Sequence, residues 1–396
     1  MKIAIIVRKL NVKGGVQKHV LHLAKELKKI GHTVRLYTFA FSKKNCYPEL
    51  LDDLEIISLG NLPQSLNIKF FGYFVGLWRE LKFSKKLAKL IDQDTEILNP
   101  HDHVCYKVAH FFKRNVRNIP SVWMMHDMPT KNFSYFRAKA INPNLKLSFL
   151  KKLFYNLVDK YEIGFIKGQD KVMVLDGRDK DWVKKYFKKD ATIVRNGVDL
   201  ESLTFTKRNV IQNKKINILM NGIFMPHRRF EDGIKAVKIL SDSGYDPYLN
   251  IVGDYKESNN YYKEIKDLIA SLGLNDKVKF HGELADKEFI NSYEENDIFI
   301  FPNHMQSWGL VVFEAMARGM PVIVSSSAGA SEILTTKENA IIVNPKSPEE
   351  IASNIATLVK DKDLYLNISL KARKFVEKNI SWANLANQMD GIFKTL

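Results

Sequence analysis

Residues 306–322 read QSWGLVVFEAMARGMPV, and this stretch decides the fold of the chain. An apolar run, residues 298–301, precedes it and predicts a β-strand, whereas the stretch itself predicts a helix that starts close to Gly309. Unpaired backbone N–H groups and the helix dipole converge at such a start, so the turn is suited to bind an anion. Glu314 lies inside the helix, where its carboxylate can accept hydrogen bonds from a ribose diol. These features predict a pocket for a nucleotide diphosphate.

A second apolar run, residues 322–324, follows the helix, and a turn of small residues then ends at the acid Glu332. This order of elements resembles the E-x7-E signature of retaining, nucleotide-sugar-dependent glycosyltransferases of family 4, which have the GT-B fold. In that family the stretch reads E-x-F-G-L-x-x-x-E-A-x-A-x-G-x-P-V. The chain keeps the second acid as Glu314 but has Gln306 in place of the first.

Apolar strand patterns alternate with amphipathic helix patterns through both halves of the 396-residue chain. The alternation predicts parallel sheets covered by helices, and the length favours two domains. A polar stretch, residues 206–215, reads as a linker between them. We expect an α/β protein with the GT-B plan of two Rossmann-like, doubly wound domains facing across a cleft. The acceptor-side domain spans 1–205 and the nucleotide-sugar-binding domain 206–380. The resemblance implies that a C-terminal helix, 381–396, packs back on the first domain.

Polar motifs follow several strands of the first half. Gly14 and Gly15 lead into a helix, and paired glycines let phosphate oxygens approach backbone amides, although such pairs also serve as plain strand-to-helix turns. His126 and Asp127 follow a strand, at the sheet edge where α/β proteins bind ligands, and His101 stands after the preceding strand. Each of these residues is therefore a candidate for a site.

The resemblance assigns roles to these motifs. Gly14 and Gly15 match a loop that faces the donor diphosphate, and His126 matches a histidine that approaches the donor sugar or stabilises charge near the transferring carbon. The side chains implied on the acceptor side are Gln17, His101, Asp127 and Asn196. An Asn-Gly pair such as Asn196-Gly197 is also typical of an ordinary turn.

The first strand-to-helix connection of the second half contains two adjacent arginines. The family usually reads G-R-L-x-x-x-K here, and this chain has Ile223 at the arginine position and Arg228 at the lysine position, with Arg229 beside it. A cation stabilises the negative charge that grows on a leaving nucleoside diphosphate, and arginine can bind phosphate bidentately. The resemblance implies catalytic roles for His126, Arg228 and Gln306. The implied donor-binding residues are Gly14, Gly15, Gly222, Arg229, Gly282, Leu284, Trp308, Gly309, Leu310, Val311, Glu314 and Glu332.

Basic residues are concentrated in the first half. Residues 1–200 contain 37 Lys and Arg against 19 Asp and Glu, whereas residues 201–396 contain 24 against 25. This asymmetry is typical either of a solvated lysine-rich surface or of a surface that meets a polyanion or an anionic membrane. Nucleic acid is disfavoured, because zinc-finger spacing and RNP-type strands are absent. A helix expected at 146–165 has an apolar stripe among lysines; packing on its own sheet is favoured and membrane contact is the alternative.

The two cysteines and the Asp-x-Asp tripeptides bear on the compartment and on cofactors. Cys46 and Cys105 lack metal-ligand spacing and are expected as core residues in a reducing cytoplasm. If the basic half binds lipid, we expect the protein to be peripheral at the inner face of the membrane. The tripeptides Asp-x-Asp, which hold a metal ion in GT-A enzymes, occur at 92–94, 179–181 and 361–363, away from strand ends. We therefore expect no metal ion and no other cofactor.

The expected function is hexosyl transfer, with retention of anomeric configuration, from a nucleotide-diphosphate sugar to an acceptor hydroxyl. A glycan or lipid-linked acceptor in cell-surface polysaccharide or glycoconjugate assembly fits the basic half. Two alternatives stay open: a GT-B sugar-nucleotide epimerase, and a catalytically silent sugar-nucleotide or polyanion binder, which Gln306 and Ile223 favour.

Overall fold

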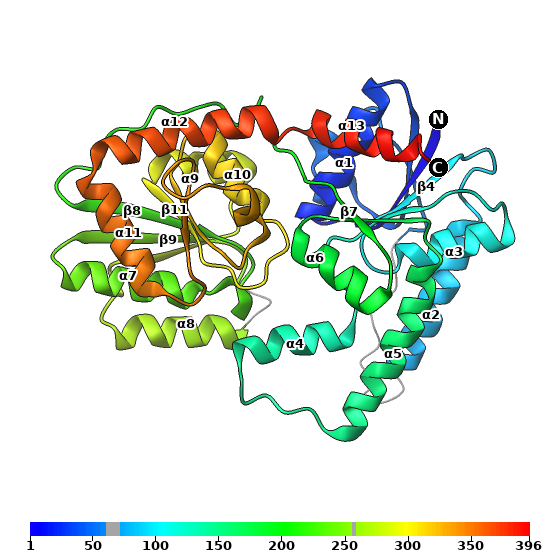
Figure 1. Ribbon diagram of the computed structural model, residues 1–396, viewed down its shortest axis with the longest axis horizontal. Coiled ribbons are helices and arrows are strands. Elements are labelled where there is room, and N and C mark those ends of the chain that lie inside the picture. The colour runs from blue at the N-terminus through cyan, green and yellow to red at the C-terminus, as the bar shows by residue number, and fades with distance from the viewer. Residues whose placement is uncertain (61–71, 256–258) are drawn as a thin grey trace. The chain divides into compact units, whose positions relative to one another are not determined.

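The computed structural model describes residues 1–60, 72–255 and 259–396, and the chain divides into two units. Unit 1 consists of Met1–Gly197 and Trp382–Leu396, and unit 2 consists of Val198–Ser381. In both units parallel strands are covered by helices, as Figure 1 shows. The expectation of an α/β protein with two Rossmann-like, doubly wound domains is confirmed.

The described strands of unit 1 form a sheet in the order β3-β2-β1-β4 and a second sheet in the order β5-β6-β7. The isolated bridges from Leu98 to Ser121 and from His101 to Met124 align β4 with β5. The strands are β1 Lys2–Leu10, β2 Thr33–Phe41, β3 Glu55–Ser58, β4 Ile97–Pro100, β5 Val122–Met124, β6 Lys171–Val174 and β7 Ala191–Ile193. The helices are α1 Gly15–Lys29, α2 Gly72–Ala88, α3 Cys105–Asn115, α4 Lys131–Ile141, α5 Phe149–Lys167, α6 Gly177–Trp182 and α13 Trp382–Phe393.

Unit 2 is built on a sheet in the order β10-β9-β8-β11-β12-β13. Its strands are β8 Lys215–Asn221, β9 Asp246–Val252, β10 Val278–Gly282, β11 Ile298–Phe301, β12 Val322–Ser325 and β13 Ile341–Val343. Its helices are α7 Phe230–Asp242, α8 Asn259–Ser271, α9 Asp286–Glu295, α10 Leu310–Ala317, α11 Pro348–Lys360 and α12 Lys362–Asn379. The strand order reverses between β8 and β11, because β9 and β10 extend the sheet on one side and β12 and β13 on the other. Ligands of doubly wound folds bind beyond the strand ends at such a switch point.

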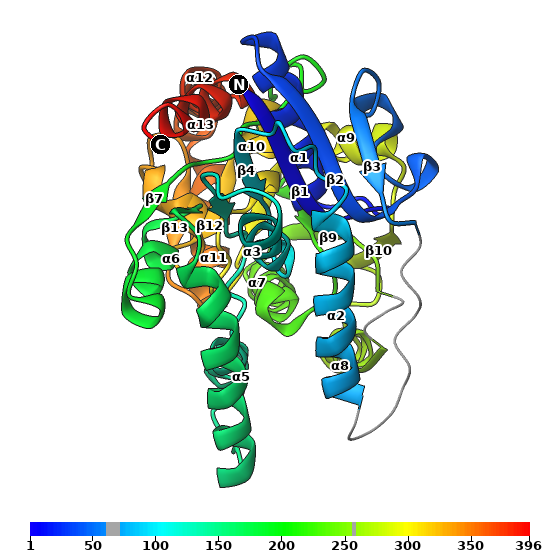
Figure 2. The ribbon, with the colours of Figure 1, turned by 90° about the vertical axis from the view of Figure 1, so that its right-hand side faces the viewer.

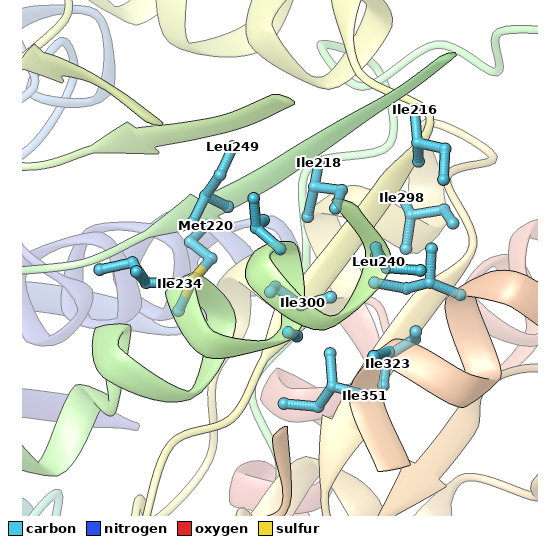
Figure 3. Close-up of a cluster of buried hydrophobic side chains, with 14 of the residues drawn as sticks. Ile216, Ile218, Met220, Ile234, Leu240, Leu249, Ile298, Ile300, Ile323 and Ile351 are labelled. Atoms are coloured by element: carbon cyan, nitrogen blue, oxygen red, sulfur yellow. The ribbon is translucent and has the colours of Figure 1, made fainter. Parts of the chain in front are cut away.

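The two central strands of unit 2 are fixed by an aliphatic core. Figure 3 shows Ile218 and Met220 of β8 and Ile300 of β11 gathered against Ile234 of α7, and all four side chains are at most 1% exposed. Full burial of such a side chain contributes roughly 1.5–3 kcal/mol. The ends of β8 and β11 are therefore rigid supports for the loops that follow them.

Helix α13 belongs to unit 1, although it is reached only after unit 2 is complete. The ring of Trp382 stacks on His22 of α1 with centroids 4.6 Å apart, and His32 Nε2 lies 2.9 Å from Asp390 Oδ1. Unit 1 is thus discontinuous in sequence, which is the arrangement that the family resemblance implies for the last helix.

The first boundary between the units lies before the 205/206 junction that the sequence predicts. Val198 pairs with Ser381, so the chain joins unit 2 as soon as it leaves Gly197. Within residues 206–215, the guanidinium of Arg208 is buried and donates hydrogen bonds to the carbonyls of Asn296 and Tyr293 at 2.8 and 2.7 Å. This stretch is therefore a packed part of unit 2, and its interpretation as a linker was wrong.

Helix α5 also departs from its predicted packing. The side chains of Phe149, Leu150, Leu153 and Leu157 are 79%, 77%, 49% and 61% exposed. The favoured prediction, that the apolar stripe of this helix packs on its own sheet, was therefore wrong for the N-terminal half of α5. In the part of the chain that the structure describes, no helix combines the length and apolar character needed to cross a bilayer.

Candidate active site

Three glycines bring bare backbone together at the ends of β8, β9 and β10. Gly222 donates a hydrogen bond to the Val252 carbonyl at 3.0 Å, and Gly253 donates one to the Gly282 carbonyl at 2.9 Å. A methyl group at Gly253 would lie 2.0 Å from the Gly222 carbonyl oxygen, so only glycine fits. The structure thus collects the predicted Gly222 and Gly282 at one edge of the sheet, and half-buried Leu284 follows in the same loop.

Arg228 lies over this edge. It ends a short 3-10 helix, Pro226–Arg228, and a methyl group at Gly222 would lie 3.4 Å from its Cδ and Nε atoms. With its amide oriented to satisfy both groups, Asn303 accepts a hydrogen bond from Arg228 Nη1 at 2.8 Å and donates one to the Arg228 carbonyl at 3.2 Å. Asn303 follows β11, so the Arg228 guanidinium is held across the switch point between β8 and β11.

Arg229 forms ion pairs within unit 2. Its guanidinium lies 2.5 Å from Glu231 Oε1 and 2.6 Å from Asp232 Oδ1, in the first turn of α7. These carboxylates neutralise its charge inside unit 2. Arg229 fixes the start of α7, whereas Arg228 is the arginine that lies along the glycine edge, and a contact of Arg229 with the donor stays a prediction.

The turn between β11 and α10 has the geometry that the sequence predicts. Gly309 has φ 101°, and a methyl group there would lie 2.8 Å from the ring of Phe301. Helix α10 starts at Leu310, so the amides of Leu310 and Val311 belong to its first turn. The side chain of Trp308 is only 2% exposed and its ring stacks on Phe313 with centroids 4.7 Å apart, so the donor contact predicted for Trp308 would come from its backbone in the turn.

Glu314 is held by a chain of hydrogen bonds that the sequence does not reveal. Asn221 Nδ2, at the end of β8, donates to the hydroxyl of Tyr293 at 3.2 Å, and that hydroxyl donates to Glu314 Oε2 at 3.2 Å. Burial, followed by the charge of Glu314, raises the pKa of Tyr293, so the phenol stays protonated and keeps donating. Glu314 is only 5% exposed, and these hydrogen bonds fix the orientation of its carboxylate.

Gln306 connects two turns of unit 2. It forms an isolated parallel bridge with Ala328, and its carbonyl accepts a hydrogen bond from Gly329 at 2.8 Å. This backbone contact places the turn after β12 beside the turn after β11. Glu332 lies in the short helix Gly329–Ile333, with an exposed side chain.

In unit 1, Gly14 and Gly15 stand at the start of α1. Gly14 is the N-cap in extended conformation, and Gly15 is the first helical residue. Gln17 Nε2 donates to the Lys9 carbonyl at 3.0 Å, and its Oε1 would lie 2.7 Å from a methyl group at Gly14. Gln17 therefore folds back over the turn, and the α1 amides have the arrangement of an anion site.

His126 and His101 form a pair, and a third histidine that the sequence analysis missed completes a cluster. His101 Nδ1 lies 3.2 Å from His126 Nε2, and His101 Nε2 lies 2.8 Å from Asn99 Oδ1. The rings of His19 and His126 are 4.8 Å apart. His101 is fully buried and supports His126, and its acceptor-side role stays a prediction. His19 is an i+4 neighbour of Gly15 and could have been found from helical spacing.

The other two residues predicted on the acceptor side have partners within unit 1, Asn196 in the core and Asp127 nearer the surface. The buried Asn196 places its Oδ1 2.5 Å from His19 Nδ1 and so orients that ring. Asp127 accepts hydrogen bonds from its neighbour Met128 and from Arg137, which lies 3.2 Å away. A cavity of about 440 Å³ opens nearby, with Arg8, His103 and Met128 among its lining residues.

The histidine cluster is also the group with metal-binding potential in the described part of the chain. The ligand nitrogens of His19, His101 and His126 lie within 4.8 Å of one another. Asn196 and Asn99 orient two of these rings, as outer-shell partners of metal-bound histidines do. Neutral imidazoles are the ligands that zinc and related ions prefer.

We expect unit 1 to lose stability in mild acid because of this cluster. Burial lowers the pKa of His19 from 6.5 to about 4, and burial also lowers the pKa of His101 and of His126. In mild acid the unfolded chain therefore binds protons that the buried imidazoles of the folded chain do not bind. As a result, the free energy of unfolding falls as the pH drops from 6.5 towards 4, by about 3 kcal/mol for His19 alone. The free energy of unfolding, measured in urea at a series of pH values between 7.5 and 4.5, would record this loss. If its dependence on pH is unchanged in His19→Asn, the assignment to His19 is contradicted.

Comparisons with known proteins identify the family of the chain. The family model described as Glycosyltransferase Family 4 matches residues 13–202, and the model described as Glycosyl transferases group 1 matches residues 202–375. An uncharacterized glycosyltransferase of Haemophilus influenzae is 24% identical and covers 95% of both chains. Mannosylfructose-phosphate synthase of Agrobacterium fabrum is 22% identical over 95% of this chain and 85% of its own.

Among solved structures, HepE from Anabaena in complex with UDP and glucose has a TM-score of 0.77. The two chains are 17% identical, and the likeness covers 100% of each, so it shows the shared fold. The two family models together extend from residue 13 to residue 375, over both units described above. The chain therefore belongs to the GT-B glycosyltransferases of family 4, which act on nucleotide-sugar donors.

Proposed function

We propose that the protein transfers a hexosyl group from a nucleotide-diphosphate sugar to an acceptor hydroxyl, with retention of anomeric configuration. The observation that carries the proposal is the convergence at the switch point of unit 2: Arg228 over the glycine edge, the Gly309 turn, and Glu314 held by Tyr293. This set supplies a cation and bare amides for a diphosphate, and a carboxylate for a ribose diol. The crystallised complex of HepE with UDP and glucose supports a donor of this class.

Transfer would proceed by positioning and charge stabilisation. When the sugar–phosphate bond breaks, negative charge grows on the nucleoside diphosphate, and Arg228 together with the α10 amides would stabilise it. The leaving phosphate oxygen would take the proton of the acceptor hydroxyl on the face from which it departs, and the new bond forms on that face. His126, held by His101, would stabilise charge near the transferring carbon.

We propose a glycan or lipid-linked acceptor of cell-surface polysaccharide or glycoconjugate assembly, presented at the inner face of an anionic membrane. The excess of 37 Lys and Arg over 19 Asp and Glu in residues 1–200 supports it, because such a surface attracts anionic lipid. Transfer would need no metal ion. Excess EDTA should leave the rate unchanged, and an EDTA-sensitive rate restored by Zn²⁺ would assign catalysis to the histidine cluster instead.

A panel of nucleotide sugars tests the proposed activity. Release of nucleoside diphosphate would be measured for each donor, with and without a membrane extract as the source of acceptor. A transferase releases the diphosphate faster when the acceptor is present. An isomerised nucleotide sugar formed without acceptor would identify an epimerase, and tight donor binding without turnover would identify a silent binder.

We expect Gln306→Glu to change donor preference. Gln306 has the reach of glutamate but no charge, and its amide adds a hydrogen-bond donor where the family places a carboxylate beside the sugar ring. The ratio of kcat/KM between the best two donors should shift by about tenfold, equivalent to about 1.4 kcal/mol. Gln212→Glu, on the surface of unit 2, makes the same charge change and should alter nothing. If Gln306→Glu behaves like this control, Gln306 has no part in donor choice.

A further inference from the structure

The N-terminal half of α5 presents an apolar stripe to solvent. The stripe consists of Phe149, Leu150, Leu153 and Leu157, and its side chains are between 49% and 79% exposed. The spacing of these positions places them on one face of the helix. Large exposed apolar residues that are grouped in this way mark an interaction surface, whereas single ones do not.

The sequence around the stripe is basic, although one of its cations, Arg137, pairs with Asp127. Between Asp127 and Asp159 the sequence has no acidic residue, and it has six basic ones, Lys131, Arg137, Lys139, Lys146, Lys151 and Lys152. Lys152 lies three positions after Phe149, and Lys160 three positions after Leu157, so both flank the stripe, and both are exposed. The partner of this surface must therefore accept apolar side chains and carry negative charge.

The acidic residues of α5 do not weaken this charge, because both are buried and paired. Asp159 accepts hydrogen bonds from the backbone amides of Lys131 and Asn132 at 2.6 and 3.0 Å, so it caps α4. Glu162 accepts from Lys107 Nζ at 2.7 Å and from the Tyr106 hydroxyl at 2.6 Å. These contacts also anchor the C-terminal half of α5 to unit 1. Figures 1 and 2 both show its other half extending away from the strands of that unit.

We propose that the apolar stripe of α5 is a docking element for an anionic lipid bilayer. Its side chains would enter the boundary between headgroups and acyl chains, while the lysines beside them contact lipid phosphates. An amphipathic helix with a basic border binds in this way, through buried apolar area and attraction to anionic lipid. A protein partner would have to be acidic as well as apolar along the same face, and it is an outcome of the test.

Docking would also place a cavity of unit 1 close to the bilayer. Val158 and Glu162, in the anchored half of α5, line the cavity of about 440 Å³ together with Arg8. Arg8 is exposed at the end of β1 and can meet an anionic group of a membrane-borne acceptor. This delivery of the acceptor rests on the proposed function, whereas lipid binding by α5 does not.

Cosedimentation of the full chain with vesicles tests the proposal. The protein should bind vesicles of equimolar phosphatidylcholine and phosphatidylglycerol, bind phosphatidylcholine alone weakly, and lose affinity as salt is added. Phe149→Ser combined with Leu150→Ser should lower the partition coefficient by about tenfold or more. Lys151→Glu combined with Lys152→Glu should lower binding to the anionic vesicles and leave the weak binding to phosphatidylcholine unchanged.

Matched controls come from α12 of unit 2. Leu370 is 49% exposed, and Lys371 and Lys374 are exposed on the same helix. The apolar control is Leu370→Ser, and the charge control combines Lys371→Glu with Lys374→Glu. Both controls should bind vesicles as the natural sequence does. Because all substituted side chains are exposed, unfolding temperatures should not change. Equal loss in α5 and α12 variants, or no binding to anionic vesicles, would overturn the proposal. A dimer in ultracentrifugation that only the α5 apolar variant dissociates would show a second copy as the occupant.

Enzyme assays separate this inference from the proposed function. Release of nucleoside diphosphate without acceptor should be the same in the α5 variants and the natural sequence, whereas transfer to a vesicle-borne acceptor should fall with the partition coefficient. A protein that binds vesicles through α5 but transfers no sugar would leave the docking inference standing and refute the function. An active enzyme whose α5 variants retain vesicle binding would do the reverse.

Discussion

Replacement of Arg228 by methionine is expected to lower kcat by about 10²–10³-fold. The guanidinium lies along Gly222 and is held by Asn303, at the place where the α10 amides and Glu314 also converge. Methionine fills a similar volume but cannot stabilise the charge that grows on the leaving diphosphate. KM for the donor should rise less than kcat falls, because the interaction strengthens as the bond breaks. Initial rates over a range of donor concentrations measure both.

Two further variants show whether charge is the cause. Arg228→Lys should keep most of the rate, since the family usually has lysine at this position. Lys235→Met removes an exposed charge from α7 of the same unit and should change nothing. A kcat of Arg228→Met within about twofold of the natural value would remove Arg228 from the transition-state contacts.

Replacement of Lys107 by methionine is expected to lower the free energy of unfolding by about 3–5 kcal/mol. The ammonium is fully buried and lies 2.9 Å from Glu80 Oε2 and 2.7 Å from Glu162 Oε1. Burial alone would lower the pKa of Lys107, but the two carboxylates outweigh burial and raise it. Methionine therefore leaves Glu162 buried without its counter-charge. Equilibrium unfolding in urea, followed by the fluorescence of the unit 1 tryptophans, measures the loss.

A control and a rescue make this result specific. Lys89→Met, on the surface of unit 1, should stay within about 0.5 kcal/mol of the natural sequence. Adding Glu162→Gln to Lys107→Met should recover part of the loss, because a neutral amide is cheaper to bury than a carboxylate. If Lys107→Met unfolds like Lys89→Met, the buried network does not hold α5 to unit 1.

Local sequence patterns are sufficient to predict the parts of the fold that local physics determines. The apolar run of β1 is continuous because the strand lies between β2 and β4 under helices, and this pattern predicts a parallel strand directly. The role of Gly309 is equally predictable, because a glycine at the start of this helix predicts a turn that other residues do not fit. The structure agrees, since Gly309 has a φ of 101° and the ring of Phe301 leaves no room for a side chain there. Fold class and the anion turn therefore follow from the sequence.

The sequence could not show which groups a given side chain contacts. Arg229 was predicted on the donor side because it stands next to Arg228, and the structure adds its ion pairs with Glu231 and Asp232. The stripe of α5 has the same pattern whether it meets a sheet or solvent, and only the structure decides between them. His19 stayed unnoticed for a similar reason, because it lies on α1 whereas its neighbours His101 and His126 follow β4 and β5.

The anomeric configuration of the product tests the central claim most directly. The enzyme would be given an α-linked nucleotide-diphosphate sugar, identified by the donor panel, and its acceptor, and the new linkage would be assigned by NMR. Retention predicts an α-linked product, formed together with one nucleoside diphosphate for each sugar transferred. A β-linked product would contradict the account, and so would consumption of the donor with no glycoside formed.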